Sequence, residues 1–309
     1  MDRSFNPAVP YFSEVRPRKF PWVNVVLFVA TCLSTLLTGT FMMMGFNQAD
    51  FSEIWHPSSL LMGLPFCIAI MSILFAHEMG HYLLCRYYGI DASLPYFIPV
   101  PILSLVGTMG AFIKIRGPIR DRGSLLEVGV AGPIAGFIVA VVALMLSIGH
   151  SRIAILEPSA DTILMGEPLI FKAAEYLAGM TPPPGMDVYL HPVSVAAWFG
   201  LLVTALNLLP AAQLDGGHIA YALFRRHHRW ISLGVVFALI PLTIFYFAGW
   251  GLWIVLLLVL RVYHPPTLDD SVPLRPRHIA LGWIGLILLV LCLTPAPIEK
   301  TSLLDLLRL

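Results

Sequence analysis

Long runs without a charged residue dominate the pattern of hydrophobic and polar positions along this chain. Residues 20–49 contain no Lys, Arg, Asp or Glu, and none lies between Glu53 and Glu78. A helix that crosses a bilayer needs about 20 apolar residues. We therefore predict an all-α polytopic membrane protein with about six to seven transmembrane helices. The first predicted spans are Trp22–Phe46, Leu60–Tyr88 and Ser124–Gly149, followed by an apolar run over 188–214, and the last span is Ile279–Leu293.

The uncharged run over 230–260 is too long for one straight crossing. At 1.5 Å per residue it would extend about 46 Å, whereas the hydrocarbon core of a bilayer is about 30 Å thick. Pro241 and the Gly249–Gly251 stretch interrupt the run. We therefore predict a helical hairpin here.

The segment after the second span does not read as a helix, although residues 92–113 carry no charge. Prolines and a glycine interrupt it, and the triplets Tyr96–Ile98 and Ala111–Ile113 have strand character. We predict a short β or irregular segment that dips into the membrane. Such backbone is tolerated there only where protein or a water-filled cavity surrounds it.

Composition agrees with the membrane prediction. Of the 309 residues, 58% are hydrophobic and 12% charged, whereas soluble domains have about 25% charged residues. The net charge of +1 and the lack of a basic run argue against a nucleic-acid partner. The four cysteines are scattered and favour neither a disulfide framework nor a cysteine metal site.

The distribution of Lys and Arg indicates the orientation. These residues number four before the first apolar run, none in 47–58, five in 86–122, two in 151–190 and three in 215–229. Loops rich in Lys and Arg stay in the cytosol. The first 21 residues also lack the features of a signal or transit peptide. We therefore expect a multi-pass protein of a bacterial or archaeal cytoplasmic membrane, with its N-terminus in the cytosol.

Chemistry enters with the motif His77-Glu78-x-x-His81, which lies inside the second predicted span. Residues four apart share a helix face, so both imidazoles can reach one metal ion. Glu78 would lie beside that ion and could take a proton from a metal-bound water. Ionisable residues at membrane depth are costly and by default mark function.

A catalytic zinc usually has three protein ligands, and the best third candidate is Asp215. If both spans enter from the outside, His77 and Asp215 lie in the same, cytosolic part of the bilayer. We expect Pro210 to kink a continuous helix and Gly216-Gly217 to turn the backbone, so that the short Asp side chain reaches inward.

These motifs together resemble the site-2 protease family of intramembrane zinc metalloproteases, peptidase family M50, in a short form without a PDZ domain. The resemblance rests on His77-Glu78-x-x-His81, Asn207-x-x-Pro210 and Leu214-Asp215-Gly216, and it covers roughly residues 60–225. The Pro95–Pro101 segment and Gln213 are more similar to the plant plastid branch and its bacterial relatives than to the Golgi branch.

The resemblance implies one zinc ion per chain, held by His77, His81 and Asp215. It implies that Glu78 is the general base for a zinc-activated water, and that Asn207 helps to bind substrate or to stabilise the oxyanion. Substrates would be transmembrane segments of other proteins, cleaved near the cytosolic side within the lipid bilayer. The predicted β segment would contribute to substrate binding through Gly107, Thr108 and Ile113.

Four regions follow from these expectations. They are a cytosolic N-terminal tail over 1–21, a first span with its external connector over 22–58, a catalytic membrane core over 59–229, and C-terminal membrane helices and tail over 230–309.

Several alternatives stay open at this stage. The same residues could serve a metal-binding transporter or an inactive scaffold. Glu127 could be an interfacial carboxylate or a site residue, and His218 a cytosolic helix residue or a fourth polar group of the site. Arg225, Arg226 and Arg229 are interpreted as orientation signals that contact anionic lipids. The oligomeric state is not specified by the sequence.

Overall fold

A computed structural model describes residues 20–307 of the chain, except 102–103, 156–162 and 261. The predicted N-terminal tail lies largely outside the described residues, together with Arg3, Arg16, Arg18 and Lys19, which contributed to the orientation argument. Arg261, which follows the predicted hairpin, also lies outside them.

The described chain is mostly helical, with two small sheets. The α-helices are α1 (Trp22–Asn47), α2 (Pro57–Met62), α3 (Leu64–Tyr87), α4 (Arg122–Ser147), α5 (Leu169–Leu177), α6 (Pro192–Asn207), α7 (Asp215–Phe224), α8 (His228–Phe245), α9 (Gly249–Val259), α10 (Pro276–Cys292) and α11 (Leu303–Leu307). The strands are β1 (Tyr96–Pro99), β2 (Thr108–Phe112), β3 (Arg152–Ala154) and β4 (Asp187–Tyr189), and short 3-10 helices cover Phe51–Glu53, Ile148–His150 and Arg225–His227.

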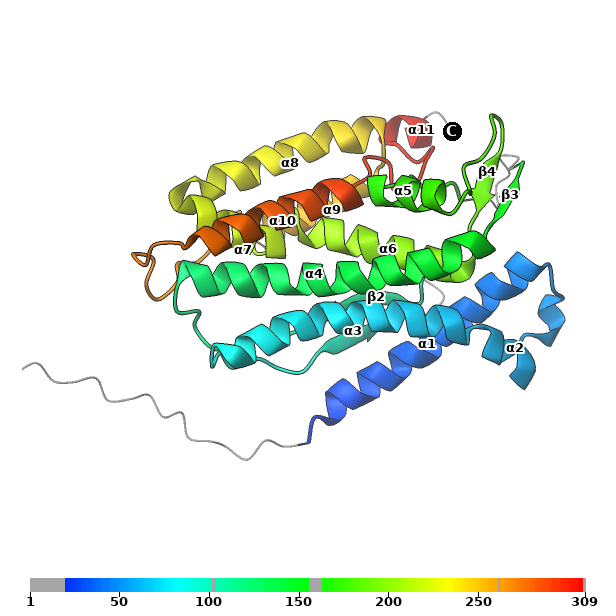
Figure 1. Ribbon diagram of the computed structural model, residues 1–309, viewed down its shortest axis with the longest axis horizontal. Helices are drawn as coiled ribbons and strands as arrows, with labels where there is room; N and C mark the ends of the chain where they lie inside the picture. The colour runs from blue at the N-terminus through cyan, green and yellow to red at the C-terminus, as the bar shows by residue number, and fades with distance from the viewer. Residues whose placement is uncertain (1–19, 102–103, 156–162, 261, 308–309) are drawn as a thin grey trace, which may run out of the picture.

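The long helices run side by side, with α4 in the middle of the bundle (Figure 1). α4 packs against α3, α6, α7 and α10, so it contacts every helix that carries part of the polar motifs. Its start is fixed by Asp121, whose side chain accepts a hydrogen bond from the backbone N–H of Ser124 at 2.8 Å. Such a cap satisfies a backbone donor that has no partner within the helix.

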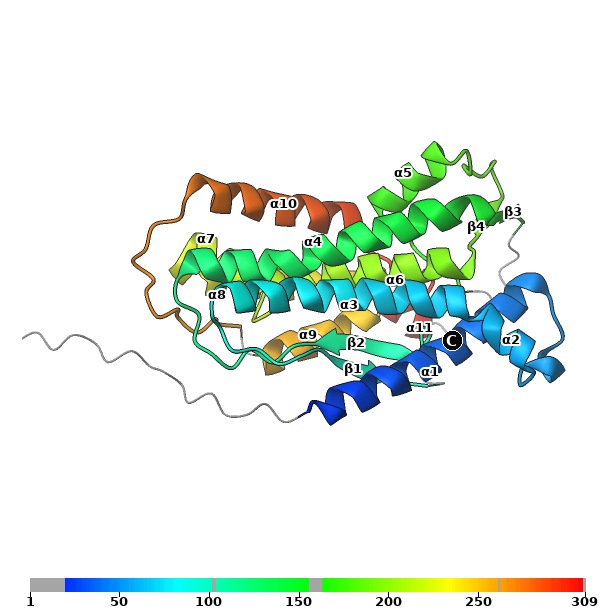
Figure 2. The ribbon, with the colours of Figure 1, turned by 60° about the horizontal axis from the view of Figure 1, so that its bottom comes forward.

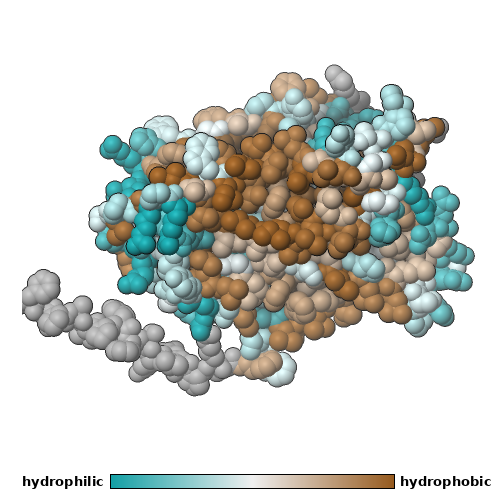
Figure 3. Space-filling model, in the orientation of Figure 1, coloured by the Kyte–Doolittle hydropathy of each residue, from teal (hydrophilic) through white to brown (hydrophobic). Residues whose placement is uncertain are grey.

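The surface has the polarity expected of a protein that spans a membrane. Hydrophobic side chains form a belt across the middle of the molecule, and hydrophilic ones gather at its two ends (Figure 3). Within the described residues, four helical segments are long and apolar enough to cross a membrane: Trp22–Asn47, Leu64–Tyr87, Arg122–His150 and Asp215–Phe245. The apolar helices α6, α9 and α10 are shorter, with 10–17 residues each.

The second predicted span is divided in two. A helix over Leu60–Tyr88 was expected, but α2 and α3 are separate, with Gly63 between them. A Cβ at Gly63 would lie 2.2 Å from the backbone oxygen of Leu36 in α1. Close packing against α1 therefore requires a glycine where the chain changes direction.

The fourth apolar run is not the single kinked helix that we predicted. α6 ends at Asn207, the backbone over 208–214 is irregular, and a new helix starts at Asp215. Within this irregular segment Ala212 has a φ of 51°, a left-handed conformation that does not occur inside a regular α-helix. The prediction of a hairpin over 230–260 corresponds to α8 and α9, which pack against each other. Pro241 lies inside α8 and does not end it.

The predicted β segment is present as an antiparallel hairpin. β1 and β2 pair through Tyr96 with Phe112 and Phe97 with Ala111, and the hairpin lies beside α1 and α3 (Figure 2). The connector between α4 and α6 holds structure that the sequence pattern did not indicate. It contains α5 and the β3–β4 sheet.

A buried carboxyl group in this connector lines a cavity of about 260 Å³ together with two further acids, Glu167 and Asp187. Glu175, on α5, is only 5% exposed. The pKa of Glu175 is raised to about 7, mainly by burial and further by the two neighbouring carboxylates, while Lys172 acts in the opposite direction. Glu175 therefore holds its proton more strongly in the folded chain than in the unfolded one.

We predict that Glu175→Gln will stabilise the protein at alkaline pH. Because the folded pKa exceeds the ordinary value of 4.5, the stability contribution of Glu175 is complete below that value and is lost as the pH rises through about 7. In thermal unfolding of the purified protein, the variant should melt a few degrees higher than the wild type at pH 8, and at the same temperature at pH 4.5. Glu53→Gln, at an exposed position, is the control. Equal melting temperatures at pH 8 would contradict the prediction.

Candidate metal centre

The two histidines of the predicted motif lie one helical turn apart on α3. Both are nearly fully buried, at 4% exposed for His77 and 6% for His81. Their rings are 5.0 Å apart between centroids and inclined at 70°, so the two Nε2 atoms converge on one point. The helical spacing predicted from the sequence therefore brings the two imidazoles together.

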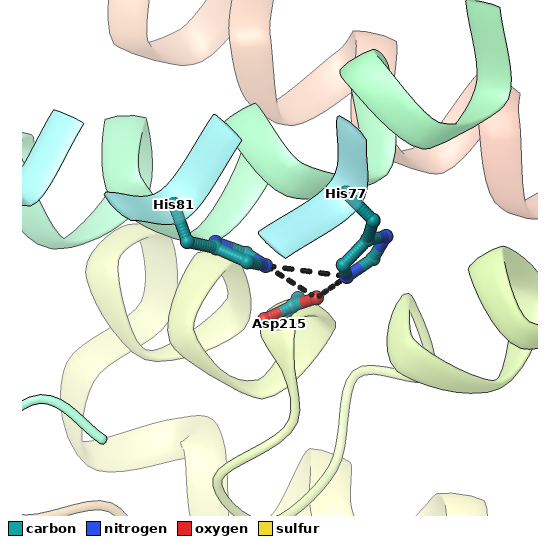
Figure 4. A group of neighbouring side chains, drawn as sticks. All are labelled: His77, His81 and Asp215. Carbon is teal, nitrogen blue, oxygen red and sulfur yellow. Dashed lines mark hydrogen bonds and ion pairs between the residues drawn. The ribbon is translucent and has the colours of Figure 1, made fainter. Parts of the chain in front are cut away.

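Asp215 completes a three-residue group (Figure 4). Its Oδ2 atom lies 3.3 Å from Nε2 of His77 and 3.2 Å from Nε2 of His81. The two Nε2 atoms are themselves 3.2 Å apart. The three potential ligand atoms therefore form a nearly equilateral triangle.

This triangle has the dimensions of one face of a zinc coordination tetrahedron. With bonds of about 2.0–2.1 Å, two ligands of a tetrahedral zinc lie about 3.3 Å apart. Among the described residues, the buried Oδ2 atom of Asp215 has no hydrogen-bond partner, which is costly unless a cation or donor satisfies it. Two imidazoles and one carboxylate are a known ligand type for zinc, so the residues fit this metal.

Three glycines of α4 lie against the residues of the metal group. A Cβ added at Gly132 would lie 2.1 Å from Nε2 of His81, and one at Gly136 would lie 3.1 Å from Nδ1 of His77. A Cβ at Gly129 would lie 3.2 Å from the backbone oxygen of Asp215. The small-residue face of α4 thus provides the space that the metal group occupies.

The backbone of α4 also orients one of the imidazoles. Nδ1 of His81 donates a hydrogen bond to the carbonyl oxygen of Val128 at 2.7 Å. This bond places the ring proton on Nδ1 and leaves Nε2 free to bind a metal. No sequence signal identifies this contact, because the acceptor is a main-chain atom.

Asp215 reaches the group by a different route from the predicted one. We expected Gly216-Gly217 to turn the backbone after a long helix, but both glycines lie in the first turn of α7. A Cβ at Gly216 would lie 2.0 Å from the carbonyl oxygen of Leu208, and one at Gly217 would lie 2.5 Å from that of Ala212. The glycines are needed because the irregular segment 208–214 folds directly against the start of α7.

Two further predicted residues border the metal group. Glu78 is buried beside His77 on α3, and its carboxylate interacts with the backbone N–H of Ile113, one residue beyond β2. The side-chain nitrogen of Asn207, at the end of α6, lies 3.2 Å from Nε2 of His77. The structure therefore brings Glu78, Asn207 and Ile113 to the same place.

Gly107 and Thr108 lie at the opposite end of β2 from Ile113. The Gly107 carbonyl accepts a hydrogen bond from the Ser34 hydroxyl on α1 at 2.6 Å. The Thr108 hydroxyl donates to the carbonyl of Ile98 at 2.9 Å. These contacts hold the hairpin together and attach it to α1, so these two residues are not brought to the metal group.

Glu127 and His218, whose roles the sequence left open, make other contacts. The Glu127 carboxylate accepts from the Tyr88 hydroxyl and lies 2.9 Å from Nη2 of Arg277 and 3.0 Å from Nε2 of His278. Glu127 thus links the ends of α3, α4 and α10, and it does not join the three potential ligands.

Nδ1 of His218 lies 2.6 Å from Nε2 of His264. The pair lines a cavity of about 470 Å³, to which Ile113, Gln213 and the chain over 265–268 also contribute. The part played by His264 was missed by sequence reasoning, because it lies 46 residues from His218 in a loop without a motif.

We predict that Gly132→Ala will weaken zinc binding at least tenfold. The new methyl group cannot share space with the His81 ring, and substitutions that disturb ligand orientation cost about 10–100-fold in metal affinity. Zinc content after dialysis against a competing chelator is the measurement. Gly234→Ala, where a Cβ meets nothing within 4 Å, is the matched control. Equal zinc retention by the two variants would show that the α4 glycines do not constrain the site.

Comparison with known proteins gives the same assignment as the motifs. Residues 65–245 match the model of peptidase family M50. The chain is 28% identical over 258 residues to the probable zinc metalloprotease EGY2, chloroplastic, of Arabidopsis thaliana. The aligned region covers 82% of this chain and 46% of that protein. It is 30% identical over 243 residues to the probable zinc metalloprotease EGY1, chloroplastic, of the same plant, covering 75% of this chain and 43% of the relative.

A third relative is the probable zinc metalloprotease EGY2, chloroplastic, of Oryza sativa subsp. indica, which is 32% identical over 250 residues, or 76% of this chain and 43% of that protein. The chain thus spans less than half the length of these relatives. Its apolar helices and the family match together identify an integral membrane protein. The family model matches more than half of the chain and includes both sequence motifs. The chain therefore belongs to peptidase family M50, the site-2 protease family of zinc metalloproteases.

Proposed function

We propose that this protein is an intramembrane zinc metalloprotease that hydrolyses peptide bonds in the transmembrane segments of other proteins. The observation that carries the proposal is the triangle of Nε2 and Oδ2 atoms, with a buried glutamate beside it. The group lies on helices whose remaining surface is apolar, so its substrates would meet it from within the bilayer.

In this proposal His77, His81 and Asp215 hold one zinc ion per chain and leave a coordination position open. When bound, zinc would polarise the scissile carbonyl group and make a water molecule more acidic. The residues of the chain do the rest. Val128 fixes the tautomer of His81 through its carbonyl oxygen, and the α4 glycines keep other side chains away from the group.

Glu78 is the general base and accepts the proton of the attacking water. A carboxylate suits this role when it is held close to the water and out of bulk solvent. The backbone N–H of Ile113 orients the Glu78 carboxylate. Asn207 offers an amide N–H as a donor toward the oxygen that becomes negative during the reaction, an effect worth about 3 kcal/mol in other hydrolases.

Water and substrate would reach the group through the 470 Å³ cavity between Ile113 and His218. Ile113 adjoins Glu78, and His218 lies one turn after Asp215 on α7. The cavity lies toward the end of the molecule that carries the basic loops, so cleavage would occur near the cytosolic side, with the N-terminus in the cytosol.

The substrate must become locally extended, because a helix hides its own amide groups in hydrogen bonds. We propose that the opened segment pairs with the β1–β2 hairpin as an added strand. The support is the position of Ile113, which ends the hairpin beside Glu78.

The test of the proposed activity is Glu78→Gln. The variant should keep the zinc content of the wild type, because the three ligand atoms are unchanged. It should lose at least about a hundredfold in cleavage of a transmembrane test substrate in detergent, the usual effect of losing a general base. Asp215→Asn should lose zinc and cleavage together, and a chelator should abolish wild-type cleavage. A wild-type protein that binds zinc but cleaves no substrate would instead favour the transporter alternative.

A second prediction concerns the hairpin. Ile113→Pro removes the backbone N–H at the end of β2 and should lower cleavage at least about tenfold with unchanged zinc content. Ile113→Ala keeps that N–H and should retain most of the activity, which makes it the matched control. If both variants cleave equally well, neither strand pairing at this position nor the contact of Ile113 with Glu78 matters for the reaction.

A further inference from the structure

A second polar cavity lies at the corner between α7 and α8, and none of its lining residues is one of the three potential metal ligands. It has a volume of about 300 Å³. Its lining is unusually rich in groups that donate hydrogen bonds and carry positive charge. The lining residues are Tyr221, Arg225, Arg226, His228, Arg229, Tyr263, His264 and Asp270.

The cavity has an excess of positive charge. Asp270 is the only carboxylate among the described residues that line the cavity. It already accepts from the Tyr221 hydroxyl at 2.6 Å and lies 3.7 Å from Nη2 of Arg225. Within the described residues, Arg226 and Arg229 have no ion-pair partner. Two guanidinium groups therefore remain available for an anion, and guanidinium groups match phosphate oxygens in geometry.

The start of α8 adds its helix dipole to these charges. The 3-10 helix over Arg225–His227 leads directly into the 18 residues of α8, and the backbone N–H of His228 donates to the carbonyl of Arg225. The dipole of a helix favours negative charge at its N-terminal end.

A buried side chain points to a ligand independently of the helix. His228, the first residue of α8, is 2% exposed and lines the cavity, yet its Nδ1 atom has no hydrogen-bond partner in the part of the chain that the structure describes. A buried polar atom without a partner is costly unless a bound group satisfies it. Backbone strain lies at the same corner, because Arg225 has a φ of 43° and a ψ of −110°. Non-glycine residues are held in such conformations mainly at functional sites.

The surroundings suit a membrane lipid. Phe224 and Trp230 are exposed on either side of the basic residues, as aromatic residues are at membrane surfaces. On the other face of the same corner, Phe224 and Ile231 line an apolar groove of about 480 Å³ that continues along α10. The corner thus combines a cationic cavity with an apolar groove at the hydrophilic end of the molecule (Figures 1 and 3).

We propose that the cavity at the α7–α8 corner is a phosphate-binding site, occupied in the membrane by the headgroup of an anionic phospholipid. Arg226 and Arg229 hold the phosphate oxygens, and the imidazole of His228 donates a hydrogen bond to them. The site does not depend on proteolysis, so its test is independent of the proposed function.

The experiment measures binding to the full-length protein in neutral detergent. Native mass spectrometry should show more adducts with dihexanoyl-phosphatidylglycerol than with dihexanoyl-phosphatidylcholine. The Arg226→Gln/Arg229→Gln variant should bind the anionic lipid at least tenfold more weakly, because each basic residue near a membrane surface contributes about fivefold. Arg116→Gln/Arg120→Gln loses the same charge from another basic loop and is the matched control.

A second arm identifies the source of the phosphate. Thermal unfolding is compared in sodium phosphate and in sodium chloride at equal ionic strength, without lipid. Stabilisation by phosphate in the wild type and the control, but not in Arg226→Gln/Arg229→Gln, supports the site with free phosphate as its ligand. Adducts of the anionic lipid with the same dependence support the site with the lipid as its ligand.

Arg226→Lys/Arg229→Lys tests the site if the glutamine variant unfolds, since it keeps the charge but loses the planar donor pairs. It should bind several-fold more weakly than the wild type. If the glutamine, lysine and control variants all bind the anionic lipid and phosphate as the wild type does, the proposal is overturned.

Discussion

The metal centre depends on the close approach of α3 and α4, which is possible only because α4 lacks side chains where the two helices meet. A methyl group at Gly132 would occupy the position of the His81 ring, so the glycine is part of the site although it has no functional group. In a membrane, small residues let helices pack closely where there is no water to drive association. Here the same device opens room for two imidazoles and one carboxylate.

A second constraint is the cost of placing these polar groups inside an apolar protein. A buried carboxylate without a partner is strongly unfavourable. The three side chains reduce this cost because they converge on one point. A cation there can balance the carboxylate charge of Asp215 and accept the lone pairs of both imidazoles. Their convergence is therefore both the structural solution to burial and the source of the proposed chemistry.

Much of this arrangement could be predicted from the sequence. The spacing of His77 and His81 specifies one face of a helix, because helical geometry is the same in every protein. The long apolar runs predicted the main helices, and proline positions together with strand-forming triplets predicted a short β or irregular segment where the β1–β2 hairpin lies. Asp215 was identified because its predicted depth in the bilayer matches that of His77 and because it lies in the motif Leu214-Asp215-Gly216.

The rest depends on tertiary contacts that leave little trace in one sequence. From the sequence, Gly216 and Gly217 were expected to form a turn, but they lie in the first turn of α7. Glycine is needed at these two positions because the backbone of residues 208–214 packs directly against them. The contact of Ile113 with Glu78 and the pairing of His218 with His264 join segments that are distant in the chain. Their partners are a main-chain amide and a loop histidine, and neither belongs to a recognisable pattern.

The carbonyl of Val128 has a consequence for how this site tolerates sequence variation. The group that selects the tautomer of His81 is a peptide oxygen, and every amino acid supplies one. The effects of substitutions at position 128 should therefore depend only on the volume and shape of the new side chain. The hydrogen bond that orients His81 is therefore specified by the backbone conformation of α4. It can persist among homologues that have different residues at position 128.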